Sequence, residues 1–245
     1  MNEILAKQMA ADYCCTIEEV CDGNSHYTVY APRPDRRRFE ENAECLLKVA
    51  VINGKLLFTG REDIIEDCRK TYGNASGEWF LHAGIPMGLQ KKLKEYGVGI
   101  KQTHPFYAAY KQTPRKSILP EGVVMKTFEQ DEILQFEEDD RFDEAFAFCK
   151  ETPDVLGIAA VKDGVIIGMA GASADSPYLW QIGINVSPEA SGMHIGTCLV
   201  EEIKNEILNR GKIPYYGTAS SHIASQRVAL AAGFLPEWVE MITEK

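Results

Sequence analysis

Residues 187–199 read SPEASGMHIGTCL, a glycine-bearing loop that runs directly into a helical pattern. The apolar residues of that pattern recur at every fourth position, at Ile195, Leu199, Ile203 and Ile207. The polar residues between them are expected to face outward: Glu201, Glu202, Lys204, Asn205 and Glu206. Backbone N–H groups at the start of this helix have no partner within it and point along its dipole, which suits a phosphate. Two interpretations stay open at this point, a phosphate loop and an ordinary helix start.

Composition limits the classes of function. The 245 residues are enough for two domains, and 26 Lys and Arg against 36 Asp and Glu give a net charge of −10. This charge argues against a nucleic-acid or membrane binder, since both need a positive surface. The seven cysteines show no metal-ligand spacing, and no apolar run approaches a membrane span. The sequence therefore predicts a cytoplasmic protein with reduced thiols and no metal.

The chain is predicted to form two domains. Residues 1–106 alternate strand and helix patterns and indicate a small α/β domain, with a hairpin turn at Asn53-Gly54 and a strand at EWFLHA, residues 78–83. Polar and proline residues at 107–120 indicate a linker. Residues 121–245 form the second domain. The stretch PRPDRRRF, residues 32–39, is a basic island that reads as a solvated loop, with an anion contact as the alternative.

The order of elements after residue 120 is regular. A strand at VVMKTFE is followed by one or two helices over 131–150 and by a hairpin that turns at Lys162-Asp163-Gly164. A strand at YLWQIGINV precedes the glycine loop and its long helix. The strand IPYYGTA, the helix SHIASQRVALAAGF and the closing strand EWVEMI complete the domain.

This order, with SPE-x-SG-x-x-IG before the long helix and AS-x-x-x-A-x-x-x-GF after the next strand, resembles the GNAT superfamily of N-acetyltransferases. The resemblance covers about residues 121–245. It implies an α/β fold of the α+β type, in which a mixed, mostly antiparallel sheet is flanked by helices. The ASQRVALAAGF segment is similar to the branch that includes the zwittermicin A self-resistance acetyltransferases, which also carries an N-terminal α/β extension.

The resemblance implies acetyl-CoA as the acyl donor and assigns residues to it. Ile184 and Val186 would offer backbone hydrogen bonds to pantetheine, and Ser225 would lie beside the cofactor. The pyrophosphate would be held by Gly192, Met193, His194, Ile195, Gly196 and Thr197. His194 stands where the family has a glycine, and Ser191 stands where it has Arg or Gln. The His194 ring has three alternatives, to contact a phosphate, to face solvent or to obstruct the pyrophosphate.

Two catalytic positions also depart from the family pattern. Gln181 stands where many relatives have a glutamate base, and Ala229 stands where many have a tyrosine acid. Transfer to an amine still needs a proton acceptor, because a protonated amine has no lone pair. Weak candidates for the missing acid are Tyr215 and Tyr216. Glu138, with its neighbours Glu137 and Asp139, is a weak candidate for the missing base.

The predicted function is therefore acetyl-CoA-dependent transfer of an acetyl group to a primary amine of a small molecule. The alternative is a catalytically weak CoA-binding or sensory module with the same fold. In a third interpretation the N-terminal half binds a partner protein. The sequence does not reveal the acceptor, the role of the N-terminal domain or the oligomeric state, and a homo-oligomer is compatible with it.

Overall fold

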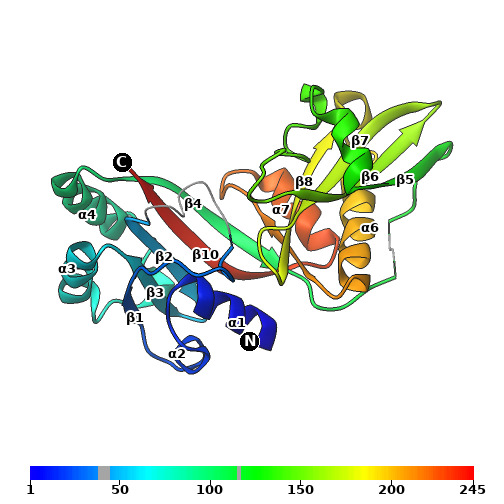
Figure 1. Ribbon diagram of the computed structural model, residues 1–245. Coiled ribbons are helices and arrows are strands. Elements are labelled where there is room, and N and C mark those ends of the chain that lie inside the picture. Colours follow the sequence, from blue (N-terminus) through cyan, green and yellow to red (C-terminus); the bar gives the residue numbers. More distant parts are fainter. Residues whose placement is uncertain (38–44, 115–116) are drawn as a thin grey trace. The chain divides into compact units, whose positions relative to one another are not determined.

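The computed structural model describes residues 1–37, 45–114 and 117–245 (Figure 1). The chain divides into two compact units, one of Met1–Phe106 with Glu237–Lys245 and one of Tyr107–Pro236. The closing strand is predicted to belong to the second domain. Its residues 238–242 instead pair antiparallel with residues 48–52, so most of this strand belongs to the first unit.

The first unit is a sheet with helices. Its strands follow the order β1-β3-β2-β10-β4, with β1 (His26–Val29), β2 (Leu47–Ile52), β3 (Lys55–Gly60), β4 (Gly99–Ala108) and β10 (Leu235–Glu244), the last two running partly outside the unit. Its α-helices are α1 (Glu3–Asp12), α2 (Ile17–Cys21), α3 (Glu62–Tyr72) and α4 (Gly84–Leu93). The hairpin at Asn53-Gly54 is confirmed, with φ of 48° and 76° at the two residues. The strand expected at residues 78–83 is wrong, because Gly77–Trp79 is a 3₁₀ helix and a turn follows.

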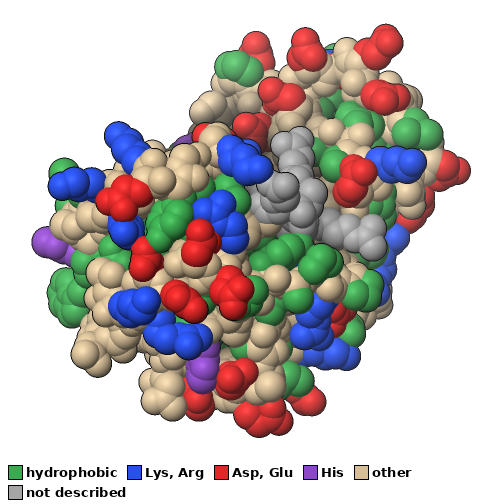
Figure 2. Space-filling model, turned by 60° about the vertical axis from the view of Figure 1, so that its left-hand side comes forward, with side chains coloured by type: hydrophobic (Ala, Val, Ile, Leu, Met, Phe, Trp, Pro, Cys, Tyr) green, Lys and Arg blue, Asp and Glu red, His purple; other side chains and the backbone are tan. Residues whose placement is uncertain are grey.

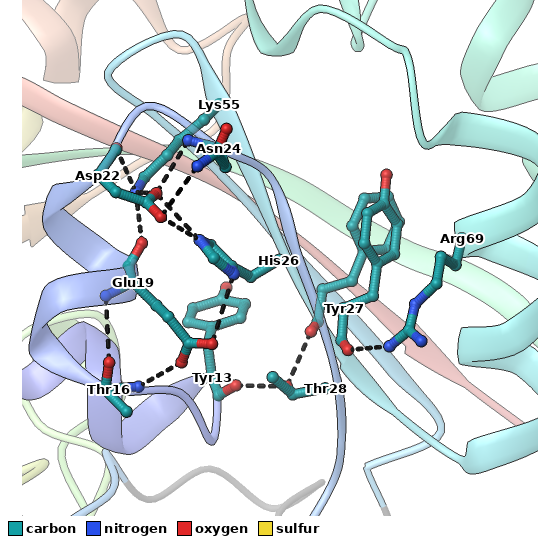
Figure 3. A network of polar contacts seen from close by, with 11 residues as sticks. Tyr13, Thr16, Glu19, Asp22, Asn24, His26, Tyr27, Thr28, Lys55 and Arg69 are labelled. Atoms are coloured by element: carbon teal, nitrogen blue, oxygen red, sulfur yellow. Dashed lines mark hydrogen bonds and ion pairs between the residues drawn. The ribbon is translucent and has the colours of Figure 1, made fainter.

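The buried Lys55 side chain binds the C-terminal end of the short helix α2. The Lys55 ammonium group donates to the backbone oxygens of Glu19 at 2.6 Å and Asp22 at 2.7 Å, and its side chain is 4% exposed. Figure 3 shows the surrounding network, in which the His26 ring contacts the Asp22 carboxylate at 3.0 Å. A helix of this length is marginal by itself. The cation on its last carbonyls therefore fixes the helix to β3.

The basic island at residues 32–39 is not a solvated loop over Arg36 and Arg37, which are 3% and 0% exposed. Arg37 donates to the carboxylates of Asp12 and Glu240, the latter at 2.7 Å. The Tyr13 hydroxyl also donates to Glu240, at 2.8 Å. Arg37 can be buried because carboxylates of the same unit neutralise it, whereas Arg36 donates to the backbone oxygen of Asp12 at 3.1 Å. Residues 38 and 39 of the island lie outside the described residues.

The second unit has the predicted mixed, mostly antiparallel sheet. Its strands follow the order β9-β8-β7-β6-β5, with β5 (Val123–Glu129), β6 (Asp154–Lys162), β7 (Val165–Ser173), β8 (Leu179–Val186) and β9 (Ile213–Gly217). Strands β5 to β8 pair antiparallel, whereas β8 and β9 pair parallel. The hairpin turn at residues 162–164 is confirmed, with φ of 50° at Asp163 and 79° at Gly164. Two longer helices, α6 (Ile195–Asn209) and α7 (Ile223–Ala231), pack against each other, and α6 packs on β6 to β9.

A row of three glycines crosses the sheet of the second unit. Gly157 is paired with Gly171, and Gly171 with Gly183, so the three lie side by side on β6, β7 and β8. A Cβ atom at Gly171 would lie 1.9 Å from the carbonyl oxygen of Ala145, and one at Gly183 would lie 1.8 Å from that of Glu144. The chain around residue 145 therefore crosses directly over this row, which only glycines permit.

The segment before β6 is less helical than predicted. Residues 131–150 were expected to form one or two helices, but they contain the end of α5 (Gln130–Ile133) and short 3₁₀ turns. Phe136, Phe142 and Phe146 from this segment pack with Phe128 and Met169 in a core of their own. Tertiary packing on the glycine row, rather than helix periodicity, determines the path of this segment.

The predicted linker covers part of α6. The Lys204 ammonium group donates to the Thr113 hydroxyl at 2.6 Å, and the Glu201 carboxylate accepts the backbone N–H of Ser117 at 3.1 Å. Glu201 and Lys204 are 1% and 0% exposed. The expectation that both face outward is therefore wrong, because residues of the linker segment supply polar partners for them. Residues 115 and 116 of this segment lie outside the described residues.

The described surface carries both signs of charge. Acidic and basic side chains lie interspersed with hydrophobic ones on the face drawn in Figure 2. In the described ranges, no helix has the length and apolar character that crossing a membrane requires. The same residues contain no group of three or more His, Cys, Asp or Glu side chains arranged to hold a metal ion.

Candidate functional site

The parallel strands β8 and β9 separate partway along β8. Their pairing runs from Leu179 with Ile213 to Ile182 with Tyr216, and it ends there. Strand β8 continues to Val186, and this second half pairs only with β7 among the described strands. The edge of β8 over residues 183–186 therefore has backbone groups that an extended ligand can reach. Ile184 and Val186, the two residues predicted to contact pantetheine, lie in this half.

The loop between β8 and α6 contains two residues in the left-handed backbone region. Gly192 has φ of 78° and His194 has φ of 60°, and His194 is the N-cap of α6. Histidine adopts this conformation more readily than β-branched residues do. The loop therefore keeps a glycine-type turn at the position where the family pattern has glycine. The His194 ring is exposed, so the structure favours an outward orientation over an inward one.

The first turn of α6 presents open hydrogen-bond donors. The first backbone bond of the helix runs from Cys198 N–H to the His194 oxygen, at 3.0 Å. The N–H groups of Ile195, Gly196 and Thr197 precede it, and no protein acceptor is found for them in the described parts of the chain. His194 provides no side-chain cap for them. Three aligned donors at the positive end of a 15-residue helix can bind an anionic oxygen group.

Gly196 brings the helix start close to the divergent half of β8. A Cβ atom there would lie 3.5 Å from Ile184 Cδ1 and 3.6 Å from Val186 Cγ2. It would also lie 3.5 Å from Val228 Cγ2 of α7. These are ordinary contact distances, so the start of α6 lies in close contact with β8 and α7 at Gly196. The open donors and the open strand edge are thus parts of one continuous surface.

Tyr216 lies where the two strands separate. It is the last residue of β9 that pairs with β8, and it is 2% exposed. Its hydroxyl is 2.9 Å from the Ser225 hydroxyl of α7, so this tyrosine is brought together with the predicted cofactor residue. Burial raises the pKa of Tyr216, the Ser225 hydrogen bond lowers it and the Glu144 carboxylate raises it, with a net rise. A tyrosine with a raised pKa keeps its proton at neutral pH and can donate it.

Tyr215 has a different environment. It is 0% exposed, and its hydroxyl contacts the Asp175 carboxylate and the Gln181 side-chain oxygen, the latter at 2.8 Å. The hydrogen-bonding capacity of this hydroxyl is thus used within the protein. Gln181, at the position where many relatives have a base, contributes to the same internal contact.

Glu138 and its neighbours make no hydrogen bond or ion pair with the residues of this site in the described ranges. Glu137 and Glu138 are exposed, and the Asp139 carboxylate is bound by Arg141 at 2.6 Å. The charge of Glu144, further along the same segment, contributes to the raised pKa of Tyr216, after burial. Neither Glu144 nor its partner Asn185 was predicted as a site residue from the sequence. The glycines within the strands at 157, 171 and 183 were the available signal, because a glycine inside a strand often marks a close backbone approach.

A family model matches part of the chain. Residues 124–234 match the model of the acetyltransferase (GNAT) family. Among solved structures, a GNAT-family protein from Novosphingobium aromaticivorans DSM 12444 is 17% identical with a TM-score of 0.42, over 60% of this chain and 66% of that one. A GCN5-related N-acetyltransferase-like protein from Streptococcus suis 89/1591 is 13% identical with a TM-score of 0.48, over 84% and 86%. The yncA protein of Salmonella typhimurium, with its cofactor acetyl-CoA, is 14% identical with a TM-score of 0.38, over 51% and 94%.

The chain spans just under two thirds of the Novosphingobium protein and 63% of a GCN5-related N-acetyltransferase from Kribbella flavida. Curated protein sequences yield no significant match. The resemblance to the zwittermicin A resistance branch stays a prediction. The family match covers the sheet from β5 to β9 with α6 and α7, which is the part of the chain that builds the site. Residues 124–234 of this chain are thus similar to the acetyltransferase (GNAT) family, whose model they match.

Proposed function

We propose that this chain is an acetyl-CoA-dependent N-acetyltransferase that transfers the acetyl group directly to a primary amine of a small molecule. One observation carries the proposal. Within a GNAT-family domain, β8 leaves β9 at Ile182 and Tyr216 immediately before a loop that opens onto three free N–H groups of α6. The arrangement offers an extended edge for pantetheine and a positive helix end for pyrophosphate.

The residues take the following roles in this proposal. The pyrophosphate is held by the loop and helix start from Gly192 to Thr197, in which His194 supplies a left-handed backbone and Met193 packs against the core. The backbones of Ile184 and Val186 bind pantetheine. Ser225 orients the Tyr216 hydroxyl, which is the proton donor for the departing thiolate. Tyr215 has no part in it, because its hydroxyl is engaged internally. Glu138 is given no part either, since it is exposed and has no hydrogen bond or ion pair with these residues in the described ranges.

The chemistry needs positioning above all. A thioester and an amine that are held in contact react in an effectively unimolecular step, which lowers the barrier by several kcal/mol. The acyl donor supplies the activated carbonyl carbon. The protein has to hold the donor, admit the amine, accept a proton from its ammonium form and protect the intermediate from water.

A second function, a CoA-binding or sensory module without turnover, is favoured by one observation. Gln181 and Ala229 occupy the positions at which many relatives have a base and an acid, Gln181 bonds to Tyr215, and Ala229 is 0% exposed. Neither residue can transfer a proton. This function predicts saturable binding of acetyl-CoA without acetylated product.

Product mass separates the two functions. The protein is incubated with acetyl-CoA and a panel of primary amines, and the amines are analysed by mass spectrometry. The seven thiols make a thiol-reagent assay for released CoA unsuitable. An amine that gains one acetyl group supports the enzyme. Thermal stabilisation by acetyl-CoA with no acetylated amine supports the binding module, and neither effect contradicts both.

A further inference from the structure

Glu144 is held over the divergent half of β8 by its backbone. The side-chain oxygen of Asn185 accepts the N–H of Glu144 at 3.1 Å and that of Ala145 at 2.8 Å. The Glu144 carbonyl oxygen lies directly over Gly183, where a Cβ atom would be 1.8 Å away. Both anchoring residues belong to the part of β8 that β9 no longer covers. The position of Glu144 is therefore fixed relative to the proposed donor site.

The Glu144 side chain is free to act. The residue is exposed, and its carboxylate has no hydrogen bond or ion pair with any other residue in the described ranges. The neighbouring Asp143 carboxylate is engaged, since it accepts the Asn185 amide N–H at 2.9 Å. The Glu144 charge also contributes to the raised pKa of Tyr216 on β9, whose main cause is burial.

We infer that Glu144 is the general base of the proposed reaction: its carboxylate, on a segment that Asn185 and Gly183 hold over the divergent half of β8, removes a proton from the acceptor ammonium ion. The inference rests on the proposed function. It names a residue that replaces the glutamate missing at Gln181, and it implies an acceptor that arrives as a cationic primary amine. Gln181 cannot serve because an amide does not accept a proton at neutral pH.

The proton and electron balance is complete with this residue. One proton passes from the ammonium nitrogen to the Glu144 carboxylate, which leaves a lone pair on the nitrogen. That lone pair attacks the thioester carbonyl carbon, the C–N bond forms and the C–S bond breaks. The bond electrons leave with the sulfur, which takes a proton from Tyr216. The nitrogen then loses its second proton, which restores Tyr216, and Glu144 releases its proton to water.

The first test uses the pH dependence of turnover. Glu144→Gln is compared with Glu144→Asp and with Glu121→Gln, a control for loss of an exposed carboxylate in the same unit. Glu144→Gln is expected to lower kcat/KM for the amine found in the panel by about a hundredfold at pH 7. The loss should shrink with rising pH, because solvent then supplies the neutral amine. Glu144→Asp should retain part of the activity, and Glu121→Gln should match the wild type.

The second test does not depend on activity. The pKa of Tyr216 is followed by NMR of ring-labelled tyrosine, with Tyr216→Phe for assignment. Glu144→Gln should lower this pKa, since it removes a nearby negative charge, while Glu121→Gln should leave it unchanged. The affinity for acetyl-CoA, measured by calorimetry, should be the same in wild type and Glu144→Gln.

The outcomes separate the inference from the proposed function. A wild type that acetylates no amine overturns the proposed function and the inference with it. A wild type that is active, with Glu144→Gln as active as Glu121→Gln or impaired equally at every pH, overturns only the inference. An unchanged Tyr216 pKa in Glu144→Gln also overturns it, because the Glu144 carboxylate would then not lie near the point where β8 and β9 separate.

Discussion

Asn185 holds Glu144 through the main chain: its side-chain oxygen accepts the Glu144 backbone N–H at 3.1 Å, while its amide nitrogen donates to Asp143 at 2.9 Å. A single side chain of β8 thus anchors the segment that crosses the glycine row. The anchor explains how a stretch with little regular helix keeps a defined position above the sheet.

Asn185→Ala should destabilise the protein by about 1–3 kcal/mol, because it leaves the N–H groups of Glu144 and Ala145 without their acceptor. Denaturant unfolding followed by circular dichroism measures the loss. Asn74→Ala is the control, since Asn74 is exposed and lies in the other unit. Equal stability of the two variants would mean that Asn185 does not anchor the segment.

His194→Gly should stabilise the protein by up to about 1 kcal/mol, because glycine adopts φ of 60° without the steric cost that a side chain carries. His194→Val should do the opposite, since β-branched residues tolerate this region least. Ser191→Gly is the matched control: Ser191 has φ of −62°, so glycine relieves nothing there. A stabilising effect of the control equal to that of His194→Gly would contradict the account.

The same His194→Gly variant determines the role of the ring. Because the ring is exposed, acetyl-CoA affinity should be unchanged when the ring is removed. Calorimetry at one fixed ionic strength measures it. Weaker binding would identify the ring as a phosphate contact, and tighter binding would show that it obstructs the loop.

The buried ion pair between Arg37 and Glu240 in the first unit should make folding stability depend on pH in the acidic range. Burial by itself raises the pKa of Glu240, but the positive charges of Arg37 and Lys48 outweigh burial and lower the pKa to about 2. The folded pKa is thus below the ordinary value of 4.5, so the carboxylate contributes stability above that value. This contribution should disappear as the pH falls from about 5 towards 2.

Glu240→Gln should reduce the loss of folding stability between pH 5 and 2. It should also lower stability at pH 7, because Arg37 loses a buried counter-ion. Chemical unfolding at several pH values measures both effects, with the exposed Glu62→Gln as control. A wild-type curve that is flat between pH 5 and 2, or a variant with the same slope as the wild type, would contradict the ion pair.

Lys55→Met should cost about 1–3 kcal/mol, since the backbone oxygens of Glu19 and Asp22 lose their cationic donor. The amide protons of α2 should also exchange faster with solvent, because the helix loses its fixed end. Hydrogen exchange measured by mass spectrometry tests this locally. Lys91→Met, at an exposed position of α4, should change neither quantity.

The sequence predicted the parts of the fold that local patterns determine. The hairpins at Asn53-Gly54 and at Asp163-Gly164 were predicted because their turns need residues that accept positive φ. The loop and helix at residues 187–209 followed from glycine spacing and an apolar stripe. The site residues on this loop and on β8 lie together in the structure, although their roles stay proposals.

Long-range contacts could not be predicted from one sequence. Lys204 and Glu201 look solvent-facing on the helix pattern, and only the chain near Thr113 and Ser117 explains their burial. Arg37 was likewise predicted to lie in a solvated loop. Its burial could not be predicted, because its partners Asp12 and Glu240 are distant in the sequence. The role proposed for Glu144 could not be predicted for the same reason, since it depends on contacts with Asn185 and on the pairing register of three glycines.

The most direct test of the proposed site is an NMR titration of the ¹⁵N-labelled protein with acetyl-CoA. The account predicts saturable shifts that are largest at the backbone amides of Ile195, Gly196 and Thr197, whose N–H groups are the open donors at the start of α6. These shifts should be absent when acetate replaces acetyl-CoA. Saturable binding that leaves those three signals unmoved, or no binding at all, would contradict the assignment of this loop as the acetyl-CoA site.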